Sequence, residues 1–220
     1  PGECAATGWY TDFSGQQGFV VSQTGGEWGS AKATAKALNF GSGRGLSVSC
    51  AAPGECSATG TYEDDDGTQS FVATQADGLW EAAIPIPNLK AQNIGNYAVP
   101  SAVSCAAPGE CSATGAYEDD DGIQGFVATQ ADGLWEAAIP IPNLKAQNIG
   151  NHAVASAVSC SVPGECTATG FYKPGIVTEG FVVTQTKGEW GRAIPIPGLR
   201  PLNTGGIATS GSVSCAAPGA

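Results

Sequence analysis

Apolar and polar positions alternate over short stretches of this chain, and turn-forming pairs such as Asp-Gly and Pro-Gly separate the stretches. Around the second of its repeats, the alternation predicts four β-strands, at residues 46–50, 56–63, 69–75 and 79–86. Asp-Gly supplies the positive φ that a tight hairpin needs, so successive strands should pair antiparallel. No window has a 3.6-residue apolar period, and we therefore expect very little helix.

The same pattern occurs four times along the chain. The units open with Pro-Gly-Glu-Cys and span about residues 1–52, 53–107, 108–162 and 163–220. One four-stranded sheet cannot cover both of its faces, whereas several sheets packed around an axis can. We therefore predict one all-β domain over residues 1–220, a four-bladed β-propeller with four antiparallel strands in each blade.

Two further features recur in every unit. A Trp and a Tyr are expected to pack between neighbouring blades, and a Ser/Thr-Gln pair is expected to bond the backbone of its hairpin. The aromatic residues are Trp28, Trp80, Trp135 and Trp190, with Tyr10, Tyr62, Tyr117 and Tyr172. The polar pairs are Ser22-Gln23, Thr74-Gln75, Thr129-Gln130 and Thr184-Gln185.

Eight cysteines at regular spacing predict disulfides and a secreted, extracellular protein. Three pairs flank a Pro-Gly hairpin, which places their sulfur atoms on adjacent strands: Cys50–Cys56, Cys105–Cys111 and Cys160–Cys166. Cys4 and Cys215 remain, at opposite ends of the chain. We expect residues 211–215 to become the innermost strand of the first blade and a Cys4–Cys215 disulfide to close the ring. Pairing within one repeat, such as Cys4–Cys50, is the alternative and would give four separate beads.

The acidic charge balance narrows the range of partners. A net charge of −11 repels phosphate backbones and anionic lipid headgroups, so we expect no nucleic-acid partner. No apolar stretch approaches the roughly 20 residues of a membrane span, so we expect no membrane insertion. A cation, a glycan or a basic protein surface suits this charge better.

The motifs Val-Ser-Cys, Pro-Gly-Glu-Cys, Ala-Thr-Gly-x-Tyr, Phe-Val-x-Thr-Gln and Gly-x-Trp resemble the Cys- and Trp-containing blade repeats of secreted proteins from actinomycete-type bacteria. The resemblance covers the whole chain and implies a secreted propeller with a binding or scaffolding role. The segment Asp77-Gly78-Leu79-Trp80 is similar to the Asp-box hairpin of sialidase-type propellers. It spaces Asp, Gly and Trp more closely than that hairpin does, so no sialidase activity follows.

The loops between the second and third strands of each unit should lie on the same face as the segments that cross from one unit to the next, which we call crossings. The candidate ligand residues lie on this face. In every crossing a basic residue stands three positions before an Asn. The Asn amide could offer both donors and acceptors to a sugar hydroxyl, and the alternative is a turn that Asn stabilises. The candidate ligand-binding residues are Lys36, Asn39, Lys90, Asn93, Lys145, Asn148, Arg200 and Asn203.

Two acidic runs, residues 63–66 and 118–121, precede a Gly on the same face. Hard cations prefer carboxylate oxygens, so Asp64, Asp66, Asp119 and Asp121 are candidate Ca²⁺ ligands. A solvated hairpin tip is the alternative. Trp9 and Phe171, beside the Tyr of their units, could stack on a sugar or pack within the fold.

These features favour a secreted binding module that recognises a glycan or cell-surface ligand, as a lectin does, through repeated loops on one face. A structural scaffold for a protein partner or for self-assembly is the alternative. We expect no enzyme, because the repeats supply no unique catalytic set and the lone His152 stands where the preceding unit has Tyr97. Ca²⁺ is the one cofactor that the sequence suggests.

Overall fold

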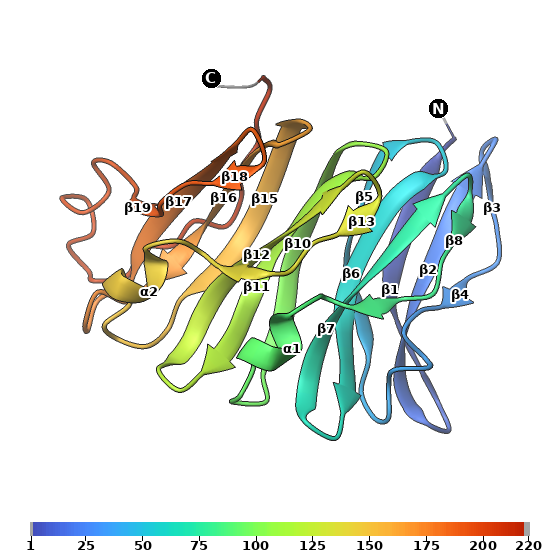
Figure 1. Cartoon of the computed structure of the whole chain (residues 1–220), viewed down its shortest axis with the longest axis horizontal. Coiled ribbons are helices and arrows are strands. Elements are labelled where there is room, and N and C mark those ends of the chain that lie inside the picture. The colour runs from blue at the N-terminus through green and yellow to red at the C-terminus, as the bar shows by residue number, and fades with distance from the viewer. Residues whose placement is uncertain (1, 218–220) are drawn as a thin grey trace.

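The computed structural model describes residues 2–217 as four antiparallel sheets (Figure 1). The outermost limits assigned to the first and fourth repeats, Pro1 and residues 218–220, lie outside this range. The first sheet contains β1 (Cys4–Asp12), β2 (Gly15–Thr24), β3 (Glu27–Trp28) and β4 (Lys32–Ala33). The second contains β5 (Arg44–Ala52), β6 (Glu55–Asp64), β7 (Gly67–Ala76), β8 (Leu79–Trp80) and β9 (Ile84–Pro85).

The third and fourth sheets repeat the arrangement of the second. The third contains β10 (Ala98–Ala107), β11 (Glu110–Asp119), β12 (Gly122–Ala131), β13 (Leu134–Trp135) and β14 (Ile139–Pro140). The fourth contains β15 (Val154–Val162), β16 (Glu165–Tyr172), β17 (Glu179–Thr186), β18 (Glu189–Trp190) and β19 (Ile194–Pro195). The helices among these residues are the single turns α1 (Leu89–Gln92) and α2 (Leu144–Gln147), so the prediction of very little helix is confirmed.

The predicted meander is confirmed for its first three strands, whereas its fourth strand is divided. β8 and β9 both pair with β7, in place of one strand over residues 79–86. Pro85 lies opposite Phe71 in the β7–β9 pair. Proline has no backbone N–H to donate, so Pro85 and Pro87 allow only a short contact at this edge of the sheet.

The four sheets stack side by side in an open row. Figure 1 shows β1–β4 at one end of the row and β15–β19 at the other. The Cys160 N–H donates to Ser104 Oγ at 3.0 Å, and the Cys215 N–H donates to Ser159 Oγ at the same distance. Residues 211–215 therefore lie against β15 just as β15 lies against β10, and each unit adds one more layer in the same direction.

The predicted Cys4–Cys215 disulfide is wrong for this structure. The predicted pairs Cys50–Cys56, Cys105–Cys111 and Cys160–Cys166 are formed, but Cys4 and Cys215 are both free. Residues 211–215 form no strand, and the sheets in residues 2–217 do not close into a ring. The four-bladed propeller is therefore not confirmed. The physical reason is that the step from one unit to the next carries the chain away from β1 rather than back to it.

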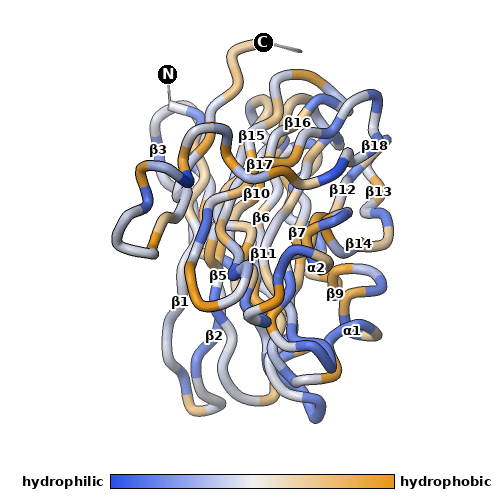
Figure 2. Tube along the Cα trace, turned by 90° about the vertical axis from the view of Figure 1, so that its left-hand side faces the viewer, coloured by the Kyte–Doolittle hydropathy of each residue, from blue (hydrophilic) through white to orange (hydrophobic). Residues whose placement is uncertain are grey.

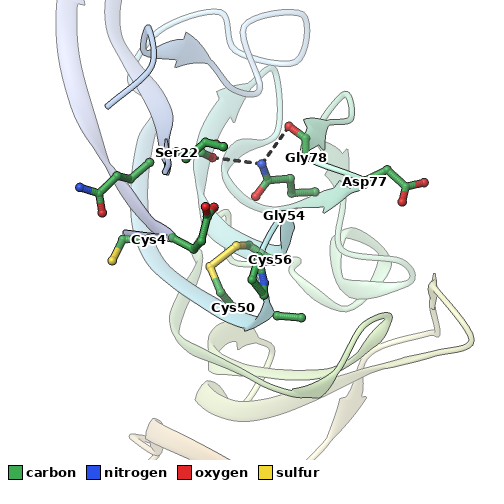
Figure 3. A pocket seen from close by; sticks show the side chains of 13 residues that line it. Cys4, Ser22, Cys50, Gly54, Cys56, Asp77 and Gly78 are labelled. Carbon is green, nitrogen blue, oxygen red and sulfur yellow. Dashed lines mark hydrogen bonds between the residues drawn. A yellow bond between two sulfur atoms is a disulfide. The ribbon is translucent and has the colours of Figure 1, made fainter. Parts of the chain in front are cut away.

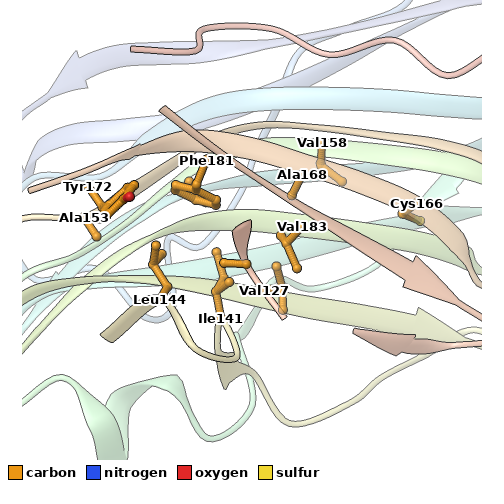
Figure 4. Packing of buried hydrophobic residues seen from close by; sticks show 12 residues of the cluster. Val127, Ile141, Leu144, Ala153, Val158, Cys166, Ala168, Tyr172, Phe181 and Val183 are labelled. Atoms are coloured by element: carbon orange, nitrogen blue, oxygen red, sulfur yellow. The ribbon is translucent and has the colours of Figure 1, made fainter. Parts of the chain in front are cut away.

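The hydrophobic core lies between successive units. Figure 4 shows Ile141 and Leu144, from the crossing that leaves the third unit, packed under Tyr172 and Phe181 of the fourth. The third unit receives Ile86 and Leu89 from the second in the same way. The expected packing of the unit aromatics is confirmed at these junctions, where Tyr62, Tyr117 and Tyr172 are 2–3% exposed.

Candidate functional site

The face predicted to carry a ligand site holds the hairpin tips and the crossings between units. In Figure 1 it is the lower side, where α1 and α2 lie near the tips. Figure 2 shows hydrophilic residues concentrated at this end of the molecule. We call it the tip face and define it by the tips at residues 12–15, 64–67, 119–122 and 173–178 and the crossings at 34–43, 86–97, 141–152 and 196–207.

Lys90, in α1, reaches the hairpin tip of its own unit. Its Nζ lies 2.8 Å from Asp64 Oδ2 and 2.8 Å from Asp66 Oδ2. The basic and acidic candidates, which the sequence suggested as two separate features, therefore form one cluster. The first and third units have equivalent pairs: Lys36 with Asp12 at 3.2 Å, and Lys145 with Asp119 and Asp121 at 2.8 Å. In the fourth unit Arg200 instead contacts Glu179, at the start of β17, at 3.4 Å.

The carboxylates change the electrostatics of the lysines. Hydrogen bonds to Asp64 and Asp66 raise the pKa of Lys90 above the usual value for lysine, and the equivalent bonds raise the pKa of Lys145. The Lys90 side chain is 46% exposed and Asp66 is 63% exposed. Because solvent screens such a pair, it should add little to the stability of the fold.

The same geometry bears on the Ca²⁺ hypothesis. The Lys90 ammonium group occupies the position between two carboxylates that a cation would take, and Asp64 Oδ1 already accepts the Asp66 N–H at 2.9 Å. Within residues 2–217, no group of three or more His, Cys, Asp or Glu side chains is arranged to hold a metal ion. Ca²⁺ binding by Asp64, Asp66, Asp119 and Asp121 stays a prediction without geometric support.

The candidate Asn side chains are used inside the protein. Asn148 is 3% exposed, and its Nδ2 donates to the Ile123 carbonyl at 3.0 Å and to Gln124 Oε1 at 3.1 Å. Its Oδ1 accepts the His152 N–H at 2.8 Å and the Lys173 N–H, from the next unit, at 3.3 Å. Asn39 and Asn93 make equivalent bonds. These amides therefore stabilise the crossing, as the alternative interpretation expects, and join it to the following unit.

The Ser/Thr-Gln pairs also join neighbouring units. Gln75 Nε2 donates to the Gly78 carbonyl at 3.0 Å, which agrees with the expected bond to the hairpin backbone. It also donates to Ser22 Oγ of the preceding unit at 3.1 Å, and Trp80 Nε1 donates to the same oxygen at 2.9 Å. Thr74 and Thr129 accept the same two bonds from the third and fourth units.

The remaining aromatic candidates differ from unit to unit. Trp9 is 51% exposed and lies 5.6 Å from the Arg44 guanidinium, a cation–π contact. Phe171 packs against His152, with ring centroids 5.6 Å apart. Burial and then the positive charge of Lys173 lower the pKa of His152 below its usual value. Trp9 and Phe171 thus have partners within the chain, and Trp9 keeps half of its surface in solvent.

A groove of ≈ 330 Å³ lies between the first two units, on the side away from the tip face (Figure 3). Its lining includes Cys4, Ser22, Gln75 and the Cys50–Cys56 disulfide. Figure 3 shows the Cys4 side chain directed away from that disulfide. Sequence reasoning did not find this groove, because it forms only where two units meet.

The role that sequence reasoning missed is contact between units. The sequence predicts a ligand site or a turn for the recurring Asn residues and a bond within the hairpin for the Ser/Thr-Gln pairs, but both sets also bond to a neighbouring copy of the repeat. One signal was present in the sequence: Ser/Thr, Gln and Trp recur together even where the tips differ. Among residues 2–217, no helix is long and apolar enough to cross a membrane. The chain matches no protein-family model and no curated protein.

Proposed function

We propose that this chain is an extracellular structural scaffold, a rigid row of repeated units that holds partners at fixed spacing. One observation carries the proposal: the polar side chains that recur in the units, such as Asn93, Gln75 and Trp80, bond to the neighbouring unit. Side chains that bond one unit to the next stabilise the arrangement of the units. A row in which each repeat contacts its neighbours presents an extended, evenly spaced surface to other molecules.

The disulfides support an extracellular location for this scaffold. Cys50–Cys56, Cys105–Cys111 and Cys160–Cys166 each join the first two strands of a sheet, one from the end of a unit and one from the start of the next. Such bonds persist in oxidising compartments and are rare where thiols are kept reduced.

Small-angle X-ray scattering of the protein with its free thiols alkylated tests the proposal. We expect an elongated particle whose scattering curve fits the open row, and slow hydrogen exchange at the junction residues. A compact ring, in which residues 211–215 pair with β1 of the same molecule, would overturn the scaffold and favour the four-bladed propeller.

A second candidate function is multivalent recognition of a glycan or cell-surface ligand on the tip face. Lys90 and Lys145 are about half exposed, and the same crossings also expose an apolar side chain, Ile94 (54%) or Ile149 (73%). Equal spacing of such pairs would add avidity to a weak single contact.

A glycan array tests this second candidate. The wild-type chain should bind a defined sugar class, and the double variant Lys90→Gln/Lys145→Gln should lose that binding while the variant Lys187→Gln, on the opposite face, keeps it. Silence of the wild-type chain across neutral and acidic glycans would remove the candidate and leave the scaffold.

A further inference from the structure

The two ends of the row have open edges that complement each other. At one end, β1 is the edge strand of its sheet among the described residues. Its counterparts β6, β11 and β16 each pair with one more strand, β5, β10 or β15, which we call the inner strand of the sheet. At the other end, residues 211–215 continue the series of inner strands but have no hairpin beside them among the described residues. Among residues 2–217, one end therefore lacks the element that the other end offers.

Gly8 marks the open edge of β1. In the other units a Cβ at this position would overlap the carbonyl of the inner strand, as at Gly60 with Arg44 and Gly170 with Val154. A Cβ on Gly8 would meet only the Phe19 ring of its own hairpin, at 3.0 Å. In the other units Gly is required because the inner strand passes close to it, and no inner strand occupies that place beside β1 among the described residues.

The aromatic residues of the first unit are exposed in the same place. Trp28 is 53% exposed, whereas its counterparts at the junctions are half-buried and donate to Ser or Thr of the preceding unit. Thr184, which corresponds to those Ser and Thr acceptors, is exposed in the fourth unit. Among the described residues, the Trp28 indole N–H at one end and the Thr184 hydroxyl at the other therefore lack the Trp-to-Ser/Thr hydrogen bond that joins the units elsewhere.

Asn203 and Gly205 mark the open edge at the far end. Asn203 Oδ1 is buried and has no hydrogen-bond partner among the described residues, whereas the same atom of Asn39 accepts the Glu63 N–H of the next unit at 2.9 Å. A Cβ on Gly205 would meet nothing within 4 Å, whereas one on Gly95 would overlap the Glu118 side chain of the next unit. This end is therefore shaped to receive another copy of the hairpin.

We propose that the chain assembles head to tail, with residues 211–215 of one molecule pairing with β1 of a second molecule. This inference rests on the proposed scaffold function and names its partner as a second copy of the chain. The register follows from the internal pairs, in which Cys50 lies opposite Cys56 and Val48 opposite Ala58. The same register places Cys215 opposite Cys4 and Val213 opposite Ala6, and it brings the Thr11 N–H to Asn203 Oδ1.

A disulfide between Cys215 of one molecule and Cys4 of the next completes the junction. Both thiols are free, and the three internal junctions hold a disulfide at the equivalent position. Bond formation oxidises two thiols, and their two electrons and two protons pass to a small disulfide such as oxidised glutathione, which is released as two thiols. Such head-to-tail contacts give open filaments, or rings if the rotation closes.

Oxidation of the purified chain with glutathione, followed by non-reducing electrophoresis and peptide mapping, tests the proposal. We expect a ladder of dimers, trimers and longer species in which Cys4 is bonded to Cys215. The single variants Cys4→Ser and Cys215→Ser should form no ladder. A mixture of the two should stop at a dimer, because each variant retains only one of the two thiols.

A third variant separates specific docking from random thiol oxidation. Gly205→Val leaves both cysteines and has room in the single molecule, but its side chain would overlap the docked hairpin. We expect it to lower the rate of ladder formation about tenfold, the factor that 1.4 kcal/mol represents. Circular dichroism should be unchanged from the wild-type chain.

Three outcomes would overturn the assembly while leaving the scaffold function untouched. The first is a ladder in which most bonds join Cys215 to Cys215 or Cys4 to Cys4. The second is an equal rate of ladder formation for Gly205→Val and the wild-type chain. The third is a monomer that stays elongated with both thiols free. A monomer with an internal Cys4–Cys215 bond would overturn both the assembly and the scaffold.

Discussion

The junction between the second and third units and the outer face of the first unit carry the same motif in two environments. At the junction, Tyr117 is 2% exposed and Phe126 is fully buried, beneath Ile86 and Leu89 of the preceding unit. In the first unit the equivalent Tyr10 and Phe19 are only half-buried. The same residue type at equivalent positions is therefore buried to different extents, because its burial depends on whether another unit packs against it.

This difference shows where the stability of the molecule lies. A single hairpin meander buries little of its apolar surface, and most of the core is made of residues from two units at once. Stability should then be approximately a sum over junctions rather than over units. The variants below compare matched positions, one at a junction and one at an end, in protein with alkylated free thiols.

The largest expected effect is that of Phe126→Ala compared with Phe19→Ala. Phe126 is completely buried, so its truncation should lower the free energy of unfolding by about 3–5 kcal/mol. Phe19 is partly exposed, and its truncation should cost about 1–2 kcal/mol. Urea denaturation followed by tryptophan fluorescence measures both. Equal losses would contradict the claim that the junction, rather than the unit, buries the ring.

A smaller effect should separate Asn148→Ala from Asn203→Ala. Removing the Asn148 amide leaves the His152 and Lys173 N–H groups without their side-chain acceptor and takes a donor from Gln124 Oε1, which should cost about 1–3 kcal/mol. Among the described residues, the Asn203 side chain makes one hydrogen bond, to the Thr178 carbonyl, and its Oδ1 is already unpaired. Its replacement should cost about 1 kcal/mol or less. A larger loss at Asn203 would mean that the far end is ordered by contacts within its own unit.

The local fold could be predicted from the sequence because its signals are local. Asp-Gly and Pro-Gly turns with alternating apolar positions determine the hairpins, and a five-residue spacing between cysteines determines three disulfides. The arrangement of the units could not be predicted in the same way. That arrangement depends on the rotation from one unit to the next, which no local turn or spacing in the sequence encodes.

The site was harder to predict than the hairpins, for a related reason. Lys90 and Asp64 are 26 residues apart, and their contact depends on where α1 places the lysine. The role of Asn93 depends on a backbone N–H in another unit, which no composition or spacing within its own unit could reveal. A residue that recurs in every repeat can be a ligand contact or a joint between repeats, and only the structure distinguishes them.

A pH titration should sharpen the comparison between junctions and ends. Burial, and then the negative charge of Asp119, raise the pKa of Tyr117 to about 12, and burial also raises the pKa values of Tyr62 and Tyr172. A raised tyrosine pKa stabilises the fold below the unfolded value of about 10, and the contribution is lost as the pH rises towards 12. Tyr117→Phe should therefore weaken the decline in stability over this range. An unchanged pH profile would show that this hydroxyl titrates freely.

The smallest expected effect concerns the charge clusters of the tip face. Lys90 contacts two carboxylates and Lys36 contacts one, yet both lysines are exposed, so neither Lys90→Gln nor Lys36→Gln should lower stability appreciably at physiological salt. At low salt, Lys90→Gln should become the more harmful change, because it leaves the run at residues 63–66 without its neutralising partner. The raised pKa of Lys90 means that its contribution is present below the usual lysine value and is lost as the pH rises above it. Urea denaturation of both variants at two salt concentrations measures the difference, and a salt-independent loss at Lys90 would assign it a packing role in α1 rather than an electrostatic one.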